Sequence, residues 1–62
     1  MCQSSVYATA GEGEELLLED VALITVDGDR LELRTLFGEP LLLRGRIRQI
    51  DLMKHRIVLE RR

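Results

Sequence analysis

The dipeptide Asp27-Gly28 separates two stretches in which apolar and polar residues alternate, and it constrains the fold more than any other feature. Before it, VALITV is rich in β-branched side chains, which favour a pleated strand. After it, RLELRT places Leu31 and Leu33 on one face and charged side chains on the other. Because glycine adopts a positive φ at no steric cost, the two stretches are predicted to form a hairpin that turns at Gly28.

The rest of the chain shows the same period of two, and five or six short strands are predicted in all. SSVYATA ends at a GEG turn, and HRIVLE follows a DLMK turn. Gly45, within LLLRGRIRQI, predicts a bend at which another strand passes closely. The pair Glu19-Asp20 is either a bulge or a turn. The alternative for that region is a helix over residues 14–23, because EELLLED contains good helix formers.

The number and spacing of these strands predict an all-β fold, a small SH3-like antiparallel barrel. The 62 residues are enough for one domain, which we take to comprise residues 1–62. A chain of this size buries roughly 60% of the surface that its unfolded form exposes, so a single copy is marginally stable. Because Cys2 is the one cysteine, an internal disulfide is excluded, which leaves a metal ion, a partner subunit or unusually good packing.

Charge is distributed unevenly along the chain. Residues 1–43 contain nine acidic and two basic residues, whereas residues 44–62 contain seven basic and two acidic ones. The formal net charge of −2 lacks the overall basicity that usually accompanies nucleic-acid binding. We therefore expect the basic last third to pair with the acidic first part, and self-association is an equally good use of this asymmetry.

Three arginines, Arg44, Arg46 and Arg48, recur at every second position, so on a strand they project from one face. A small RNA-binding module that uses this basic strand face is therefore the alternative function. RNA-binding sheets normally add aromatic side chains for base stacking, and this chain has only Tyr7 and Phe37. Phe37 is expected to pack in the core or in a turn, so nucleic-acid binding is the less favoured interpretation.

The sequence shows neither a signal peptide nor an apolar run long enough to cross a membrane, so a cytoplasmic location is expected. Ser4 and Ser5 have no evident base, and GEGE lacks the lysine of a phosphate-binding loop. We therefore expect that the protein is not an enzyme.

Four segments, MCQSSVY, LLLEDV, LELRTLFGE and GRIRQIDLMKHRIVLE, together resemble the CooT family of small nickel-binding proteins. That family is associated with nickel supply to carbon monoxide dehydrogenase, and its distinguishing mark is the Met-Cys start. The resemblance implies a homodimer of SH3-like subunits, a Ni(II) site that depends on Cys2, and a nickel carrier or metallochaperone with a client nickel enzyme.

The chemistry of Cys2 is compatible with this implication. Thiolate is a soft, strong donor, and square-planar geometry with nitrogen ligands suits Ni(II) or Cu(II). If Met1 is retained, its amine and the Cys2 amide can join the sulfur in two fused five-membered rings; if Met1 is removed, the Cys2 amine and the backbone nitrogen of Gln3 take these parts. One chain offers too few ligands for a closed site, so one nickel per homodimer, held by two copies of Cys2, is predicted.

Two further groups of possible ligands have simpler interpretations. His55 is either a pH-responsive group near the metal or a residue that stabilises the last hairpin. The acidic residues of the first half could attract hydrated cations, although a solvated loop is the simpler interpretation; they are Glu12, Glu14, Glu15, Glu19 and Asp20.

Overall fold

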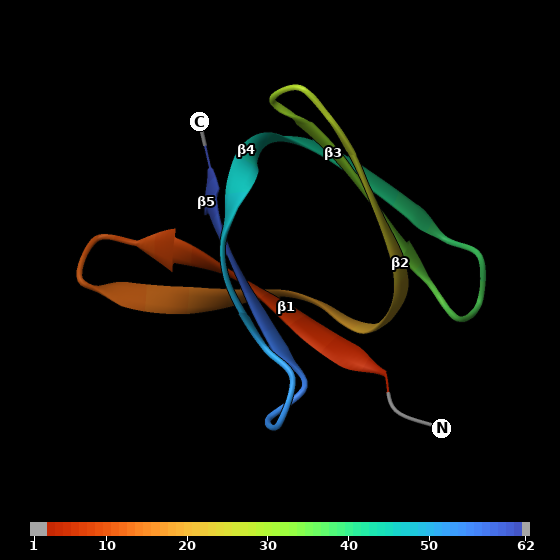
Figure 1. Cartoon of the computed structure of the whole chain (residues 1–62), viewed down its shortest axis with the longest axis horizontal. Helices are drawn as coiled ribbons and strands as arrows, with labels where there is room; N and C mark the ends of the chain where they lie inside the picture. Colours follow the sequence, from red (N-terminus) through yellow and green to blue (C-terminus); the bar gives the residue numbers. More distant parts are fainter. Residues whose placement is uncertain (1–2, 62) are drawn as a thin grey trace.

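The computed structural model describes residues 3–61, which form five strands and no helix (Figure 1). The strands are β1 (Ser4–Ala10), β2 (Gly13–Asp27), β3 (Arg30–Thr35), β4 (Pro40–Asp51) and β5 (Arg56–Arg61). Each strand pairs with the next, and β1 also pairs with β5, so the sheet closes into a barrel. The expectation of an all-β fold is confirmed.

The pairing that closes the barrel is parallel, with Ser5 opposite Arg56 and Ala8 opposite Leu59. The other four pairings are antiparallel, as expected. The difference follows from the strand number. When an odd number of strands alternates in direction around a closed sheet, the first and last strands run the same way. The prediction of a wholly antiparallel barrel is therefore wrong at this one seam.

The long strand β2 corrects the prediction for the region around Glu19-Asp20. Its first half pairs with β1 and its second half with β3, and the ladder has irregularities close to Val21. Asp20 has a φ of 59°, and its carbonyl oxygen accepts a hydrogen bond of 2.9 Å from the backbone N–H of Leu36. The pair is thus a bulge in one bent strand, and the helical alternative is wrong, because tertiary pairing overrides local helix propensity.

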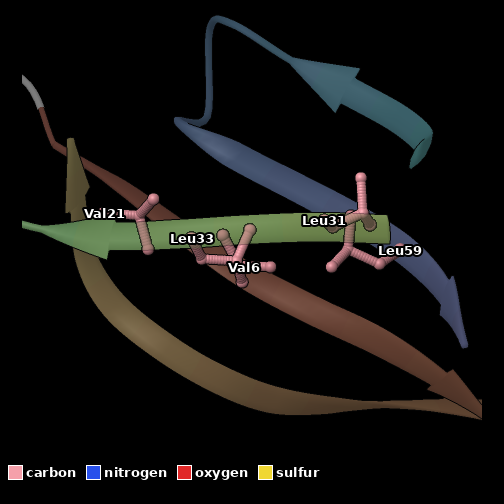
Figure 2. Close-up of a cluster of buried hydrophobic side chains, with 5 residues drawn as sticks. All are labelled: Val6, Val21, Leu31, Leu33 and Leu59. Carbon is pink, nitrogen blue, oxygen red and sulfur yellow. The ribbon is translucent and has the colours of Figure 1, made fainter. Parts of the chain in front are cut away.

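The core is a small apolar cluster that runs along β3, with side chains from four strands (Figure 2). Leu31 and Leu33 of β3 are buried, and the charged residues between and beside them face outward, as the alternation predicts. The other members of the cluster are Val6, Val21 and Leu59. Full burial of one such side chain stabilises the fold by about 1.5–3 kcal/mol, so the five define one tightly specified interior.

Two glycines adopt the conformations that the sequence predicts. Gly28 has a φ of 63° and lies in the turn between β2 and β3, where Asp27 faces Arg30. Gly45 lies where β4 begins to pair with β5, and a Cβ atom there would stand 2.4 Å from the carbonyl oxygen of Glu60. The prediction of a close strand passage at Gly45 is therefore confirmed.

The two ends of the barrel differ in composition. We call the end where β1 begins the N-terminal rim; it carries the bulge at Asp20 and the turns of residues 36–39 and 52–55. The C-terminal rim is the end where β5 finishes, and it carries the turns of residues 11–12 and 28–29. In Figure 1 the N-terminal rim lies at the lower right and the C-terminal rim at the upper left. Large apolar side chains are exposed in the turns of the N-terminal rim, namely Leu36, Phe37, Leu52 and Met53.

Candidate metal centre and charged surfaces

The predicted nickel ligands lie at the start of the chain, and the structure describes only part of that segment. Met1 and Cys2 are outside the described residues, so their role as ligands stays a prediction. Gln3 is half-buried and directly precedes β1. The backbone N–H of Ser5 donates a hydrogen bond of 2.9 Å to the carbonyl oxygen of His55. The start of β1 is thus attached to the turn between β4 and β5.

His55 is exposed at the end of that turn, with a φ of 53°. Within the same turn, the backbone N–H of Lys54 donates to a carboxylate oxygen of Asp51 at 3.1 Å. The main chain of His55 therefore joins the last hairpin to β1, which matches the simpler interpretation of this residue. Across residues 3–61, no group of three or more histidine, cysteine, aspartate or glutamate side chains is placed to hold a metal ion.

The turn between β3 and β4 contains Phe37, so of the two predicted positions, core or turn, the core is wrong. Thr35 is buried, and its hydroxyl oxygen accepts hydrogen bonds from the backbone N–H groups of Phe37 and Glu39, at 3.2 and 3.3 Å. Arg34 also donates to the carbonyl oxygen of Gly38 at 3.0 Å. These bonds fix a turn that extends beyond the last strand pair. Phe37 stands on this turn with 80% of its surface exposed, so it is not a core residue.

The basic last third does pair with the acidic first part of the chain. Arg56 binds Glu14, and its guanidinium group also lies 4.4 Å above the ring of Tyr7. Arg61 lies 3.9 Å from Glu15. The predicted pairing is confirmed for these two arginines, which hold the ends of distant strands together. Two residues of the acidic run, Glu14 and Glu15, therefore interact with arginine.

The three alternating arginines of β4 are all exposed and alternate with more buried neighbours, as the sequence predicts, but each borders a different hollow. Arg44 borders a hollow between β2, β3 and β4. Arg46 binds Glu60 at 2.7 Å, beside a second hollow at the C-terminal rim. Arg48 borders a third hollow, together with Thr9 and Glu14. The reason is the shape of β4, which changes from pairing with β3 to pairing with β5 at Gly45 and has a bulge between Ile47 and Gln49.

One arrangement was not visible in the sequence. Arg30 of β3 lies directly opposite Arg44 of β4, because the ladder pairs them through their Cα atoms. The two residues are fourteen positions apart, so only the strand register brings them together. The alternation of residues along a single strand does not reveal this pair.

Comparison with known proteins identifies the chain. The sequence pattern of the family described as CO dehydrogenase accessory protein CooT matches residues 1–60. The chain belongs to the CooT family. An uncharacterized protein of Methanothermobacter thermautotrophicus is 38% identical over 60 residues, which cover 97% of this chain and 89% of that protein. An uncharacterized protein of Archaeoglobus fulgidus is 37% identical over 43 residues, which cover 69% of this chain and 96% of that protein.

A solved structure gives the same answer. The crystal structure of a protein designated CooT, from Carboxydothermus hydrogenoformans, has a TM-score of 0.89 and 34% sequence identity, covering 98% of both chains. The resemblance inferred from the sequence is thus confirmed, and the chain is a member of a family of accessory proteins for CO dehydrogenase. Within residues 3–61 there is no helix long and apolar enough to span a membrane.

Proposed function

We propose that this CooT protein is a nickel carrier or metallochaperone, which binds Ni(II) through Cys2 and delivers it to a nickel enzyme such as carbon monoxide dehydrogenase. The observation that carries the proposal is the family match over residues 1–60, which includes the Met1-Cys2 start. A small accessory protein that presents one thiol at the front of its chain suits the transfer of a soft-ligand metal.

The described residues that follow Cys2 are fixed to the fold. The backbone N–H of Ser5 donates a hydrogen bond to the carbonyl oxygen of His55, which ties the start of β1 to the turn of residues 52–55. The donors that we propose are the Cys2 sulfur with the Met1 amine and the Cys2 amide nitrogen or, if Met1 is removed, the Cys2 sulfur with its own amine and the Gln3 backbone nitrogen. Each must lose a proton before it binds, so Ni(II) affinity is expected to rise with pH.

The N-terminal rim supports a homodimer of SH3-like subunits that shares one nickel ion. This rim carries exposed apolar side chains of the kind that a subunit contact covers. Phe37 is 80% exposed and Met53 is 90% exposed. A contact with two-fold symmetry at this rim uses the same surface on both copies. It would bring the two chain starts together, and with them two thiolates and their backbone nitrogens.

Native mass spectrometry of the protein with and without Ni(II) tests the proposal, alongside absorption titrations. We expect a dimer that carries one nickel ion and shows a thiolate-to-metal charge-transfer band. The nickel ion and the band should be lost in Cys2→Ser. A His55→Ala variant serves as the control and should keep the band. Equal Ni(II) binding by the Cys2→Ser variant would overturn the role of the thiol, and nickel bound by monomers alone would overturn the shared site.

A further inference from the structure

The cross-strand pair Arg30 and Arg44 is electrostatically unfavourable by itself. Side chains directly opposite in an antiparallel ladder have Cβ atoms about 4.5–5.5 Å apart, and like charges at that separation destabilise the pair. Both residues are exposed and lie on the outer face of the barrel, since their neighbours Leu31 and Leu43 are turned toward the core. A second function is one reason for a small protein to hold two positive charges in this position.

Four of the five other arginines within residues 3–61 have acidic partners, and Arg48 is the exception. Arg34 binds Glu32 at 2.6 Å, and arginines 46, 56 and 61 bind glutamates. Between residues 3 and 61, no carboxylate forms an ion pair with Arg30 or Arg44. Glu32, which lies between Arg30 and Arg34 on β3, is already bound to Arg34. Their guanidinium groups therefore keep their hydrogen-bonding capacity for another molecule.

The two arginines border a hollow of about 440 Å³ that also has an apolar wall. Leu42, which is 70% exposed, forms part of this wall, and Thr25 lies across β3 from it. A guanidinium group binds a carboxylate through two parallel hydrogen bonds, and two such groups side by side strengthen that preference. The hollow thus combines an anion-binding pair with an adjacent apolar contact surface.

We propose that this hollow is a docking site for an acidic segment of a partner protein, in which a carboxylate binds Arg30 and Arg44 and a neighbouring apolar side chain packs on Leu42. The site lies on β2, β3 and β4 near the turn of residues 28–29, away from the start of the chain. The proposal therefore does not depend on nickel binding, although one partner can engage both regions.

Two other occupants fit the hollow less well. RNA-binding sheets use aromatic side chains for base stacking, and no aromatic side chain lines this hollow. A second copy of this chain would use the exposed apolar turns of the N-terminal rim, where large side chains are concentrated. A carboxylate with an apolar neighbour matches the arginine pair and the apolar wall of the hollow, whose lining also contains Asp27 and Glu32.

The test is a titration of the full chain followed by the backbone amide signals of Thr25, Glu32, Leu42 and Arg44. The probe is the peptide acetyl-Leu-Asp-Leu-amide, compared with acetyl-Leu-Asn-Leu-amide, inorganic phosphate and a single-stranded RNA oligonucleotide. We expect saturable shifts with the aspartate peptide and about tenfold weaker binding of the asparagine peptide, because the charge-assisted hydrogen bonds are lost. Equal binding of both peptides, or shifts at these amides with RNA alone, would overturn the proposal.

Variants separate a binding role from a structural one. Arg44→Gln should weaken the aspartate peptide about tenfold and raise Tm, since the like-charge contact is relieved. Leu42→Ser should weaken both peptides. Arg46→Gln is the matched control, because Arg46 is on the same strand but bound to Glu60. This variant should leave the peptide affinity unchanged and should not raise Tm. A lower Tm for Arg44→Gln, or a change of oligomeric state in this variant, would overturn the proposal.

Discussion

The two rims of the barrel are closed by turns of opposite character. At the C-terminal rim the turns contain Gly11 and Gly28 with acidic neighbours, and arginine ion pairs hold the strands close to it. At the N-terminal rim the turns expose Phe37, Leu52 and Met53 to solvent. Water hydrates the first kind of turn at little cost, whereas the second kind leaves apolar surface uncovered. The C-terminal rim thus has ion pairs between its strands, whereas the N-terminal rim leaves large apolar side chains exposed.

Substitution of Gly45 should have the largest effect, because it disturbs the close contact between β4 and β5 beside the C-terminal rim. In Gly45→Ala the new Cβ atom meets backbone, which cannot rotate away, so we expect a loss of about 3 kcal/mol in the free energy of unfolding. Urea denaturation followed by circular dichroism measures it. The control is Gly13→Ala, where the nearest atom to a new Cβ is 4.0 Å away. Similar losses for both variants would show that this close contact is not the cause.

Thr35→Val should have an intermediate effect, and it acts at the N-terminal rim. The valine keeps the shape of the buried side chain but leaves the backbone N–H groups of Phe37 and Glu39 without their acceptor. We expect a loss of about 1–3 kcal/mol in thermal or urea unfolding. Thr25→Val, at an exposed position, is the matched control. If the two valine variants were equally stable, the turn would not depend on the hydroxyl group.

The double variant Phe37→Ser with Met53→Ser should have the smallest effect on the subunit and yet distinguish the rims. Both side chains are largely exposed, so the free energy of unfolding of a single subunit should change by less than about 0.5 kcal/mol. Light scattering after size exclusion should show the loss of the proposed dimer. Leu42→Ser, on the outer face, should leave the oligomeric state unchanged. A dimer that survives the double substitution would place the subunit contact elsewhere.

Local signals were enough to predict much of this fold. The turn at Gly28, the close passage at Gly45 and the alternation in β3 each have a signal in a short stretch of sequence, and each is present in the structure. The continuity of β2 through Asp20 and the exposure of Phe37 depend on contacts between distant segments. Sequence periodicity does not encode such contacts.

The candidate sites differ in the same way. The argument for Cys2 depends on donor atoms that are adjacent in the chain and on the family match, so it could be made from the sequence. The Arg30 and Arg44 pair depends on the register between β3 and β4. A shift of that register by one residue would turn one of the two side chains to the other face.

The parallel seam between β1 and β5 also has a practical consequence. With five strands in alternating directions, β1 begins at one rim and β5 finishes at the other, as the N and C labels of Figure 1 show. A fluorescent reporter or a surface linker attached behind Arg61 would thus project away from Ser4. Protein immobilised through such a linker would keep the N-terminal rim, with the exposed Phe37 and Met53, open to the solution.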